Sequence, residues 1–417
     1  MRGAIADHLY AIRRYAAADC VYVNTLVRNL PTWLVRSDFD LIVFHTTLLS
    51  MRWGRDRFPD LIERLRPLAS NRATRIALPQ DEFINTDLLC DFVNALDVRY
   101  VFSVAPESTW GQIYAGIDRE RVRLHKVLTG YVDARRIERI RHLASAISSR
   151  PIDVGYRAYG IRHALGRHGY LKIEIAERAR PLLAERGLSA DISTRFEDTL
   201  YGDDWTRFLL RSRYTLGVEG GASLFDPDGS IHAKVREYMS AHPTASFEAV
   251  EAACFPGRDG TFDLMAISPR HLEACATRTV QILVEGEYSG VLQPDVHYIP
   301  VCKDLSNLEE VLCELGDEER RSRIAERAYA DVVSSGRYSY ETFVERLLAC
   351  AHPATRDPAL SPGALRLGPV RSAWLSLAER LSWTRPLLRG VVATTLYAME
   401  RRFPRLAVLR RRLRRTT

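Results

Sequence analysis

Residues 268–299 read SPRHLEACATRTVQILVEGEYSGVLQPDVHYI, and this stretch decides the fold of the second half of the chain. The pattern predicts a helix over Pro269–Cys275 that ends in small residues and leads directly into an apolar strand, Thr279–Val284. A glycine-containing loop follows, and then a second strand, His297–Val301. Helices that alternate with short apolar strands are typical of βα units, so the stretch predicts a parallel α/β sheet.

The same alternation extends outward through most of the chain. The other predicted strands are Cys20–Thr25, Phe39–Thr46, Ala73–Leu78, Tyr100–Val104, Val122–Leu128, Asp153–Tyr156, Ala190–Ser193 and Tyr214–Val218. The other predicted helices are Arg55–Leu68, Thr86–Leu96, Ala134–Ser149, Leu171–Glu185, Asp203–Arg211, Ile231–Ser240, Ser246–Ala253 and a series from Leu308 to about Cys350. We therefore predict an α/β protein with two Rossmann-like domains, residues 1–150 and 151–350, facing a cleft. Open sheets of this kind bind ligands outside the carboxyl ends of their strands.

Length and composition describe an ordinary globular protein. The chain has 417 residues, enough for two domains, with 46% hydrophobic and 27% charged side chains. Its start carries Asp7, Arg13 and Arg14 and no long apolar run, which argues against a signal peptide or a membrane anchor. The seven cysteines form no CxxC pair. This spacing predicts a reduced, cytoplasmic setting and no structural zinc. A high arginine content with little lysine indicates a GC-rich bacterial genome.

Charge is distributed unevenly along the chain. Residues 364–417 contain thirteen arginines and two acids, a local charge of +11. The remaining 46 basic and 50 acidic side chains give residues 1–363 a charge of −4, which argues against nucleic-acid binding by the body. Residues 351–417 are predicted to be a linker followed by a basic amphipathic tail. The tail either lies on an anionic membrane surface, at about 1 kcal/mol for each basic side chain, or is a solvated, partly disordered end.

A family resemblance is carried by four stretches. They are the quoted residues, Asp153–Gly160, Leu165–Lys172 and Asp317–Tyr329. Together they resemble the donor domain of GT-B glycosyltransferases, and they are most similar to the glycosyltransferase-like group related to spore-maturation proteins. The resemblance covers roughly residues 153–350 and is weak in the N-terminal half. In such enzymes a helix-borne glutamate accepts hydrogen bonds from the donor ribose, and the resemblance implies this role for Glu273. A carboxylate suits that role because it accepts two hydroxyl protons in charge-assisted bonds.

The resemblance also implies a diphosphate site. Many GT-B donor domains use one Arg and one Lys after the first strand of this domain, and the matching residues here are Arg157 and Lys172. Two cations on a loop that leads into a helix N-terminus would stabilise the negative charge that grows on a nucleoside diphosphate leaving group. The alternative for each is an ordinary surface ion pair.

A glycine-rich loop follows the strand Tyr214–Val218. It contains Glu219, Gly220, Gly221 and Ser223, and glycine lets a ligand approach the backbone closely because it has no Cβ. We expect this loop to face the sugar or the phosphates.

Two further acids, Asp226 and Asp228, have the spacing of the metal-binding DxD motif of the other main glycosyltransferase fold. That fold normally has one nucleotide-binding domain, and the two-unit pattern disfavours it. We therefore expect no metal and no cofactor other than a UDP-, GDP- or dTDP-linked sugar as donor substrate.

The sequence departs from the retaining families of this group at one position. Their pattern has a first acid eight residues before the ribose-binding one, and Met265 stands there. The stereochemistry therefore stays open, and no catalytic acid is evident in the second half. In the first half His45, Asp81 and Glu82 end strands, where an acceptor-side base would lie. The alternative for each is a satisfied polar group at a strand end.

The leading hypothesis is the transfer of a hexose-type sugar from a nucleoside diphosphate to a polysaccharide, glycolipid or protein acceptor. An epimerase or a phosphorylase of the same fold is a second possibility. A phosphorylase normally carries a pyridoxal lysine, and nothing in the context of Lys303 supports one. A catalytically degenerate scaffold that acts as a binding or assembly protein is a third, favoured by Met265. The sugar, the base and the acceptor stay open.

Overall fold

The computed structural model describes residues 3–25, 30, 32–37, 39–158 and 163–351. The chain divides into two compact units, one formed by residues 1–16 with 40–356 and the other by residues 17–39 with 357–417. In the second unit the described residues hold one short helix, α2 (Thr32–Arg36). The predicted strand Cys20–Thr25 is wrong, because these residues form no strand. An apolar run becomes a strand only where a neighbouring strand pairs its N–H and C=O groups. The predicted tail lies outside the described residues.

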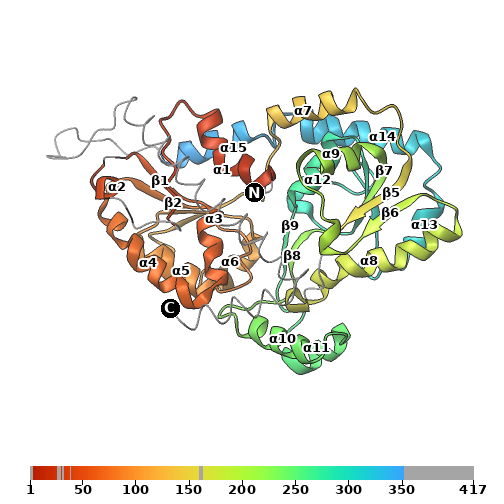
Figure 1. Cartoon of the computed structure of the whole chain (residues 1–417). Coiled ribbons are helices and arrows are strands. Elements are labelled where there is room, and N and C mark those ends of the chain that lie inside the picture. The colour runs from red at the N-terminus through yellow and green to blue at the C-terminus, as the bar shows by residue number, and fades with distance from the viewer. Residues whose placement is uncertain (1–2, 26–29, 31, 38, 159–162, 352–417) are drawn as a thin grey trace, which may run out of the picture. The chain divides into compact units, whose positions relative to one another are not determined.

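The first unit contains a four-stranded parallel sheet in the order β1-β2-β3-β4. Its strands β1 and β2 are labelled in Figure 1. Its strands are β1 (Leu41–Phe44), β2 (Thr74–Ala77), β3 (Tyr100–Ser103) and β4 (Arg123–Lys126). The helices around it are α1 (Gly3–Tyr15), α3 (Thr46–Leu49), α4 (Phe58–Leu65), α5 (Thr86–Ala95) and α6 (Trp110–Ile113). The predicted alternation from residue 39 to residue 128 is therefore confirmed, whereas α1 was not predicted.

A second parallel sheet, in the same unit, has five strands in the order β11-β10-β7-β5-β6. Its strands are β5 (Ile152–Arg157), β6 (Ala190–Ser193), β7 (Ser212–Gly217), β10 (Val280–Val284) and β11 (Ile299–Val301). The helices are α8 (Gly166–Glu185), α9 (Gly202–Arg211), α10 (Ser230–Ala241), α11 (Phe247–Cys254), α12 (Pro269–Ala276), α13 (Leu308–Cys313) and α14 (Glu318–Ala328), which continues as a π-helix (Tyr329–Ser334). The α/β fold class with two Rossmann-like parallel sheets is confirmed. That the two sheets face a cleft stays a prediction.

The strand β10 shows why its sequence predicts a buried strand. Every residue of β10 is buried. Val280, Ile282 and Val284 pack into a core with α8 and α13, whereas Leu283 packs with α12 on the opposite face. Side chains alternate between the two faces of a strand, so a strand covered on both faces has a continuous apolar run.

The part of the chain that holds the first sheet and the part that holds the second are called here the two halves of the unit. Each half contributes one helix to the core of the other. The helix α7 (Ala134–Ala144), which follows the first sheet in sequence, packs Ile140 and Leu143 with residues of α9 and α12. The helix α15 (Tyr340–Ala351), which follows the second sheet, buries Phe343 against the first sheet and α1. Sequence order alone therefore does not divide the two halves, and the predicted limits at residues 150 and 350 stay a prediction.

The two chain segments that connect the halves are hydrogen-bonded to each other. The Val132 N–H donates to the Tyr338 carbonyl at 2.8 Å, and the Tyr340 N–H donates to the Val132 carbonyl at 3.0 Å. These bonds form an isolated parallel bridge between Val132 and Ser339. The crossing segments are therefore held as a pair.

Candidate functional site

The order of the second sheet indicates where a ligand would bind. The chain builds β5 first, adds β6 on one side, and then adds β7, β10 and β11 on the other. In open α/β sheets the ligand crevice lies outside the carboxyl ends of the strands at this switch point, here between β5 and β7. Arg157 is the last residue of β5, and Glu219 follows β7 by two residues. Both were predicted site residues.

Glu219 is almost fully buried and is held by the loop after β10. Its Oε1 accepts the Tyr288 N–H at 2.6 Å, and its Oε2 accepts the Glu287 N–H at 3.2 Å. Gly286 lies against this side chain: a Cβ at that position would lie 2.1 Å from Glu219 Oε2, so a larger residue would displace the carboxyl. Burial raises the pKa of the Glu219 carboxyl to about 7. The carboxyl thus braces the glycine-containing loop and is poised to exchange a proton near neutrality.

His168, on α8, lies beside Glu219. Its Nε2 is 3.1 Å from the Glu219 backbone oxygen, and because a carbonyl only accepts, this nitrogen is assigned as the donor. Burial, together with the smaller effect of the nearby Lys172 charge, lowers the pKa of His168 to about 4. Lys172 lies four residues along α8. His168 is therefore neutral at pH 7, and it was not predicted.

Arg157 is held by groups of the protein itself. Its Nη2 donates to Asp191 Oδ1 at 2.7 Å, and its Nη1 donates to the Asp191 carbonyl at 2.8 Å. The guanidinium also lies over the Phe208 ring, 4.4 Å from the centroid. The predicted phosphate role thus requires Arg157 to exchange the Asp191 contact for the ligand. Arg270 of α12 donates to the Arg157 carbonyl.

The N-terminus of α8, which the predicted diphosphate site needs, is already capped. Ser223 Oγ accepts the His168 N–H at 3.1 Å and donates to Asp259 Oδ1 at 2.8 Å. Asp259 Oδ1 also accepts the Arg167 N–H at 3.1 Å. A carboxylate stabilises a helix N-terminus as an anion does. Ser223 therefore helps to place Asp259 there, and Asp259 was not predicted.

The glycine pair pairs with another strand. Gly220 and Gly221 lie in β8 (Gly220–Ala222), which is antiparallel to β9 (Leu264–Ala266). Gly221 has φ +126°, and a Cβ there would lie 1.7 Å from the Leu264 carbonyl oxygen. Glycine thus admits the backbone of β9 at this position. Met265, which stands where the retaining pattern has an acid, is the β9 residue paired with Gly221.

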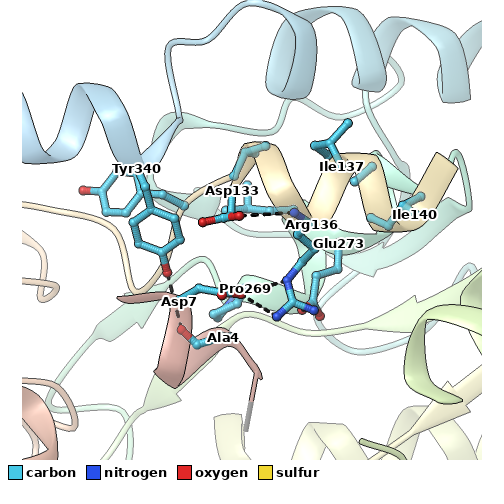
Figure 2. Close-up of a pocket in the computed structure, with 13 residues that line it drawn as sticks. Ala4, Asp7, Asp133, Arg136, Ile137, Ile140, Pro269, Glu273 and Tyr340 are labelled. Atoms are coloured by element: carbon cyan, nitrogen blue, oxygen red, sulfur yellow. Dashed lines mark hydrogen bonds and ion pairs between the residues drawn. The ribbon is translucent and has the colours of Figure 1, made fainter. Parts of the chain in front are cut away.

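Glu273 lies on α12 with its carboxylate between two other elements. Its Oε2 accepts the Trp205 indole N–H of α9 at 2.7 Å, and its Oε1 is 4.0 Å from Arg136 Nη1 of α7. The side chain is 16% exposed, and burial raises the pKa of the carboxyl. Figure 2 shows Glu273 beside Arg136 in a small pocket that Asp7 and Tyr340 also line. Among the residues that the structure describes, Glu273 is the only predicted site residue that lines this pocket.

The acids of the DxD spacing cap a helix. Asp226 is fully buried, and its carboxylate accepts the Ile231 and His232 N–H groups at the start of α10, at 3.1 and 2.9 Å. Asp228 Oδ1 accepts the Ser230 N–H at 3.1 Å. In the described part of the chain no three His, Cys, Asp or Glu side chains are grouped as a metal site would require.

The three candidates in the first half have different surroundings. His45 Nε2 lies 2.9 Å from His8 Nδ1, and its Nδ1 accepts the Thr47 N–H at the start of α3. Glu82 is fully buried and accepts bonds from the Ser103 and Tyr114 hydroxyls and the Val104 N–H. Asp81 is exposed and has φ +54°. The structure therefore gives His45 and Glu82 protein partners and leaves the Asp81 side chain on the surface.

Lys126, which was not predicted, ends β4 at the same edge of the first sheet. Its Nζ donates to the Val104 carbonyl at 2.7 Å. Burial lowers the pKa of this half-buried ammonium, whereas Glu82, Glu107, Glu219 and Glu287 raise it. The one signal that points to Lys126 in the sequence is its position at the end of a strand in a chain with four lysines.

Helices in the described residues are too short or too polar to cross a bilayer. The basic residues 364–417 lie outside the part of the chain that the structure describes.

Comparison with known proteins gives likenesses of fold alone. No protein-family model matches the chain, and no curated protein matches it. Among solved structures, Anabaena HepE in complex with UDP-glucose is 11% identical, with 75% of this chain and 79% of that chain covered and a TM-score of 0.40. An alpha,alpha-trehalose-phosphate synthase (UDP-forming) from Burkholderia vietnamiensis is 11% identical, with 74% and 72% covered and a TM-score of 0.44. Neither likeness assigns a ligand or an activity to this chain.

Proposed function

We propose that this chain is a glycosyltransferase that moves a hexose-type sugar from a nucleoside diphosphate to a polysaccharide, glycolipid or protein acceptor. The observation that carries the proposal is the half-buried carboxylate of Glu273, which stands on the helix that leads into β10. A carboxylate with one oxygen bonded to Trp205 and the other beyond hydrogen-bond distance from Arg136 can accept two ribose hydroxyls by exchanging the indole.

In this proposal the diphosphate lies at the switch point of the second sheet. Arg157 and Lys172 neutralise it, which stabilises the charge that develops on the leaving group. Glu219, Gly220, Gly221 and Ser223 form the wall of the donor site. An acceptor-side base among His45, Asp81 and Glu82 completes the reaction from the first half. Bringing the sugar and the acceptor together in the correct orientation supplies a large part of the rate enhancement over the uncatalysed reaction.

Calorimetric titration tests the donor site. UDP, GDP, ADP and dTDP are titrated into the protein and into Glu273→Ala. We expect one nucleotide to bind in the micromolar range and the variant to lose about 2 kcal/mol of binding free energy, the contribution of hydrogen bonds to a charged group. The matched control is Glu326→Ala, which removes an exposed carboxylate that pairs with Arg278. Equal affinity in the protein and in Glu273→Ala would contradict the ribose role.

A second function is favoured by specific observations. Met265 occupies the position of the acid in the retaining pattern, and Arg157 is already paired with Asp191. Both fit a degenerate scaffold that binds or assembles partners without turnover. Hydrolysis of the nucleotide sugar by the isolated protein separates the two functions. An enzyme slowly transfers the sugar to water and releases the nucleoside diphosphate, whereas a scaffold releases none.

The cellular setting belongs to the same proposal. We place the chain in the bacterial cytoplasm, at the inner face of the membrane, where residues 364–417 contact anionic lipid and the acceptor is a glycan of the cell envelope. Co-sedimentation with phosphatidylglycerol vesicles tests this contact. Deletion of residues 364–417 is expected to abolish binding, and unchanged binding would rule the contact out.

A further inference from the structure

Arg136 lies between two carboxylates that come from different elements (Figure 2). Its Nε and Nη2 both donate to Asp7 of α1, the first at 3.0 Å. The third nitrogen, Nη1, lies 4.0 Å from Glu273 Oε1. A guanidinium is a rigid planar fork, so two nitrogens fixed on Asp7 also fix the direction of the third.

Asp7 is itself held in place by a wider network. It accepts a hydrogen bond at 2.9 Å from Arg14, which lies seven residues further along α1. Arg14 also donates to Asp133 at 2.8 Å, and Asp133 caps α7 by accepting the Arg136 N–H at 3.1 Å. The contact is close, because a Cβ on Gly3 would lie 2.4 Å from Arg136 Nη2. The N-terminal helix and α7 are therefore bound together by the same ion pairs that orient Arg136.

We propose that Arg136 is a positioning residue that keeps the Glu273 carboxylate charged and directed at its ligand, and that Asp7 of the N-terminal helix α1 holds Arg136 for this task. The inference rests on the proposed function, in which that ligand is a ribose diol. A half-buried carboxylate loses much of its hydration, and one bond from a neutral indole does not replace it. A fixed guanidinium close by supplies the missing stabilisation without covering the oxygen that the ligand needs.

The charged groups around Glu273 agree with this assignment. Burial raises the pKa of the carboxyl, and Arg136 is the strongest influence in the opposite direction, followed by Trp205 and Arg270. Asp7 raises the pKa. Asp133 at the start of α7 and the Tyr340 hydroxyl of α15 also line the pocket. Loss of Arg136 therefore shifts Glu273 toward its neutral form, which accepts one fewer hydroxyl proton.

A titration without ligand tests the pairing directly. Trp205 donates to Glu273, so protonation of that carboxyl changes the fluorescence of Trp205. The signal is the difference in emission between the full chain and its Trp205→Phe variant, because the chain has six tryptophans. Arg136→Met is expected to raise the midpoint of this titration by about one pH unit, and Arg136→Lys, which keeps the charge, is expected to restore it. Arg139→Met is the matched control, since Arg139 lies on the same helix and pairs with the exposed Asp203.

Nucleotide titration over pH 6 to 9 completes the test. Arg136→Met is expected to bind the nucleotide more weakly than the parent at pH 7 and to regain affinity as pH rises, because a higher pKa lowers the ionised fraction of Glu273 at a given pH. Arg139→Met should keep the affinity and pH profile of the parent. A fluorescence midpoint that is the same in Arg136→Met and the parent chain would overturn the inference. A shifted midpoint in a protein that binds no nucleotide would uphold the pairing and overturn the proposed function alone.

Discussion

At the scale of single residues, burial decides which polar side chains contribute to the stability of the fold. Asp81 and Glu82 are neighbours that look alike in sequence. Asp81 is exposed, whereas Glu82 is fully buried near Arg52, whose guanidinium donates to the carbonyls of Leu49, Gln80, Asp81 and Ile84. Burial raises the pKa of the Glu82 carboxyl and lowers that of the Arg52 guanidinium. Each of these two charges offsets part of the cost of burying the other, and Asp81 also stabilises the Arg52 charge.

The difference between Glu82 and Asp81 predicts that substitutions of these two neighbours lower the free energy of unfolding by different amounts. Glu82→Ala removes a buried carboxylate whose charge stabilises Arg52 and leaves the Ser103 and Tyr114 hydroxyls without their acceptor. We expect the free energy of unfolding to fall by about 3 kcal/mol, as for a broken buried charge network. Asp81→Asn should change it by less than about 0.5 kcal/mol. Urea denaturation followed by circular dichroism measures both, and equal losses would contradict the structural role of Glu82.

A buried histidine pair makes stability depend on pH. His8 on α1 and His45 before α3 are 2.9 Å apart, and burial lowers the pKa of His8 to about 4 and that of His45 to about 3. An unfolded histidine has a pKa near 6.5. The unfolded chain therefore binds more protons below that value, and the contribution of the pair is lost as pH falls from about 6.5 toward 4, at about 1.4 kcal/mol per pH unit for each histidine.

Comparison with a variant isolates this effect, since Glu82 and Glu273 titrate in the opposite direction. The double variant His8→Gln, His45→Gln carries no titrating group at this place. We expect its free energy of unfolding to fall less steeply between pH 6.5 and 5 than that of the parent. Urea unfolding at several pH values measures the slopes, and parallel curves would show that the pair does not titrate on unfolding.

At the scale of elements, the ribbon of β8 and β9 depends on a backbone that only glycine allows. Gly221 and Gly187 both have positive φ, +126° and +65°, but only Gly221 has another backbone where a Cβ would stand. Gly187→Ala should cost about 1 kcal/mol for its conformation. Gly221→Ala should cost at least about 2 kcal/mol more, because β9 must move away from β8. Thermal unfolding compares the two variants, and equal costs would mean that the pairing with Leu264 is dispensable.

At the scale of the whole first unit, two helices pack with the sheet that is distant from them in sequence. The helix α7 packs with the elements around the second sheet, and α15 packs against the first. Phe343→Ala removes a buried ring from the core of β1–β4 and should cost about 3 to 4 kcal/mol. Hydrogen exchange should then show reduced protection in the first sheet, although residue 343 follows the second sheet in sequence. Leu312→Ala, in the core of β5–β11, is the control and should show the reverse. Equal losses in both sheets from each variant would contradict this assignment.

The sequence by itself determined the alternation of strands and helices. The strand β6 (Ala190–Ser193) coincides with its prediction, and β7, β10, β11 and α12 lie within a few residues of theirs, because apolar periodicity follows local geometry. It also pointed to the helix that carries Glu273. It did not predict α1 or the ribbon of β8 and β9, and it placed a strand at residues 20–25, which pair with no strand in the part of the chain that the structure describes.

Only the tertiary structure decided what the polar residues touch. Asp259 occupies the start of α8, Arg136 reaches Glu273 across 137 positions of sequence, and Glu219 binds the amides of a loop that follows another strand. None of these contacts has a local signature, because a hydrogen bond or an ion pair depends on where two distant segments are brought by the packing of the sheets. Periodicity reports which face of an element is buried, and the partners on that face follow from the order of the strands.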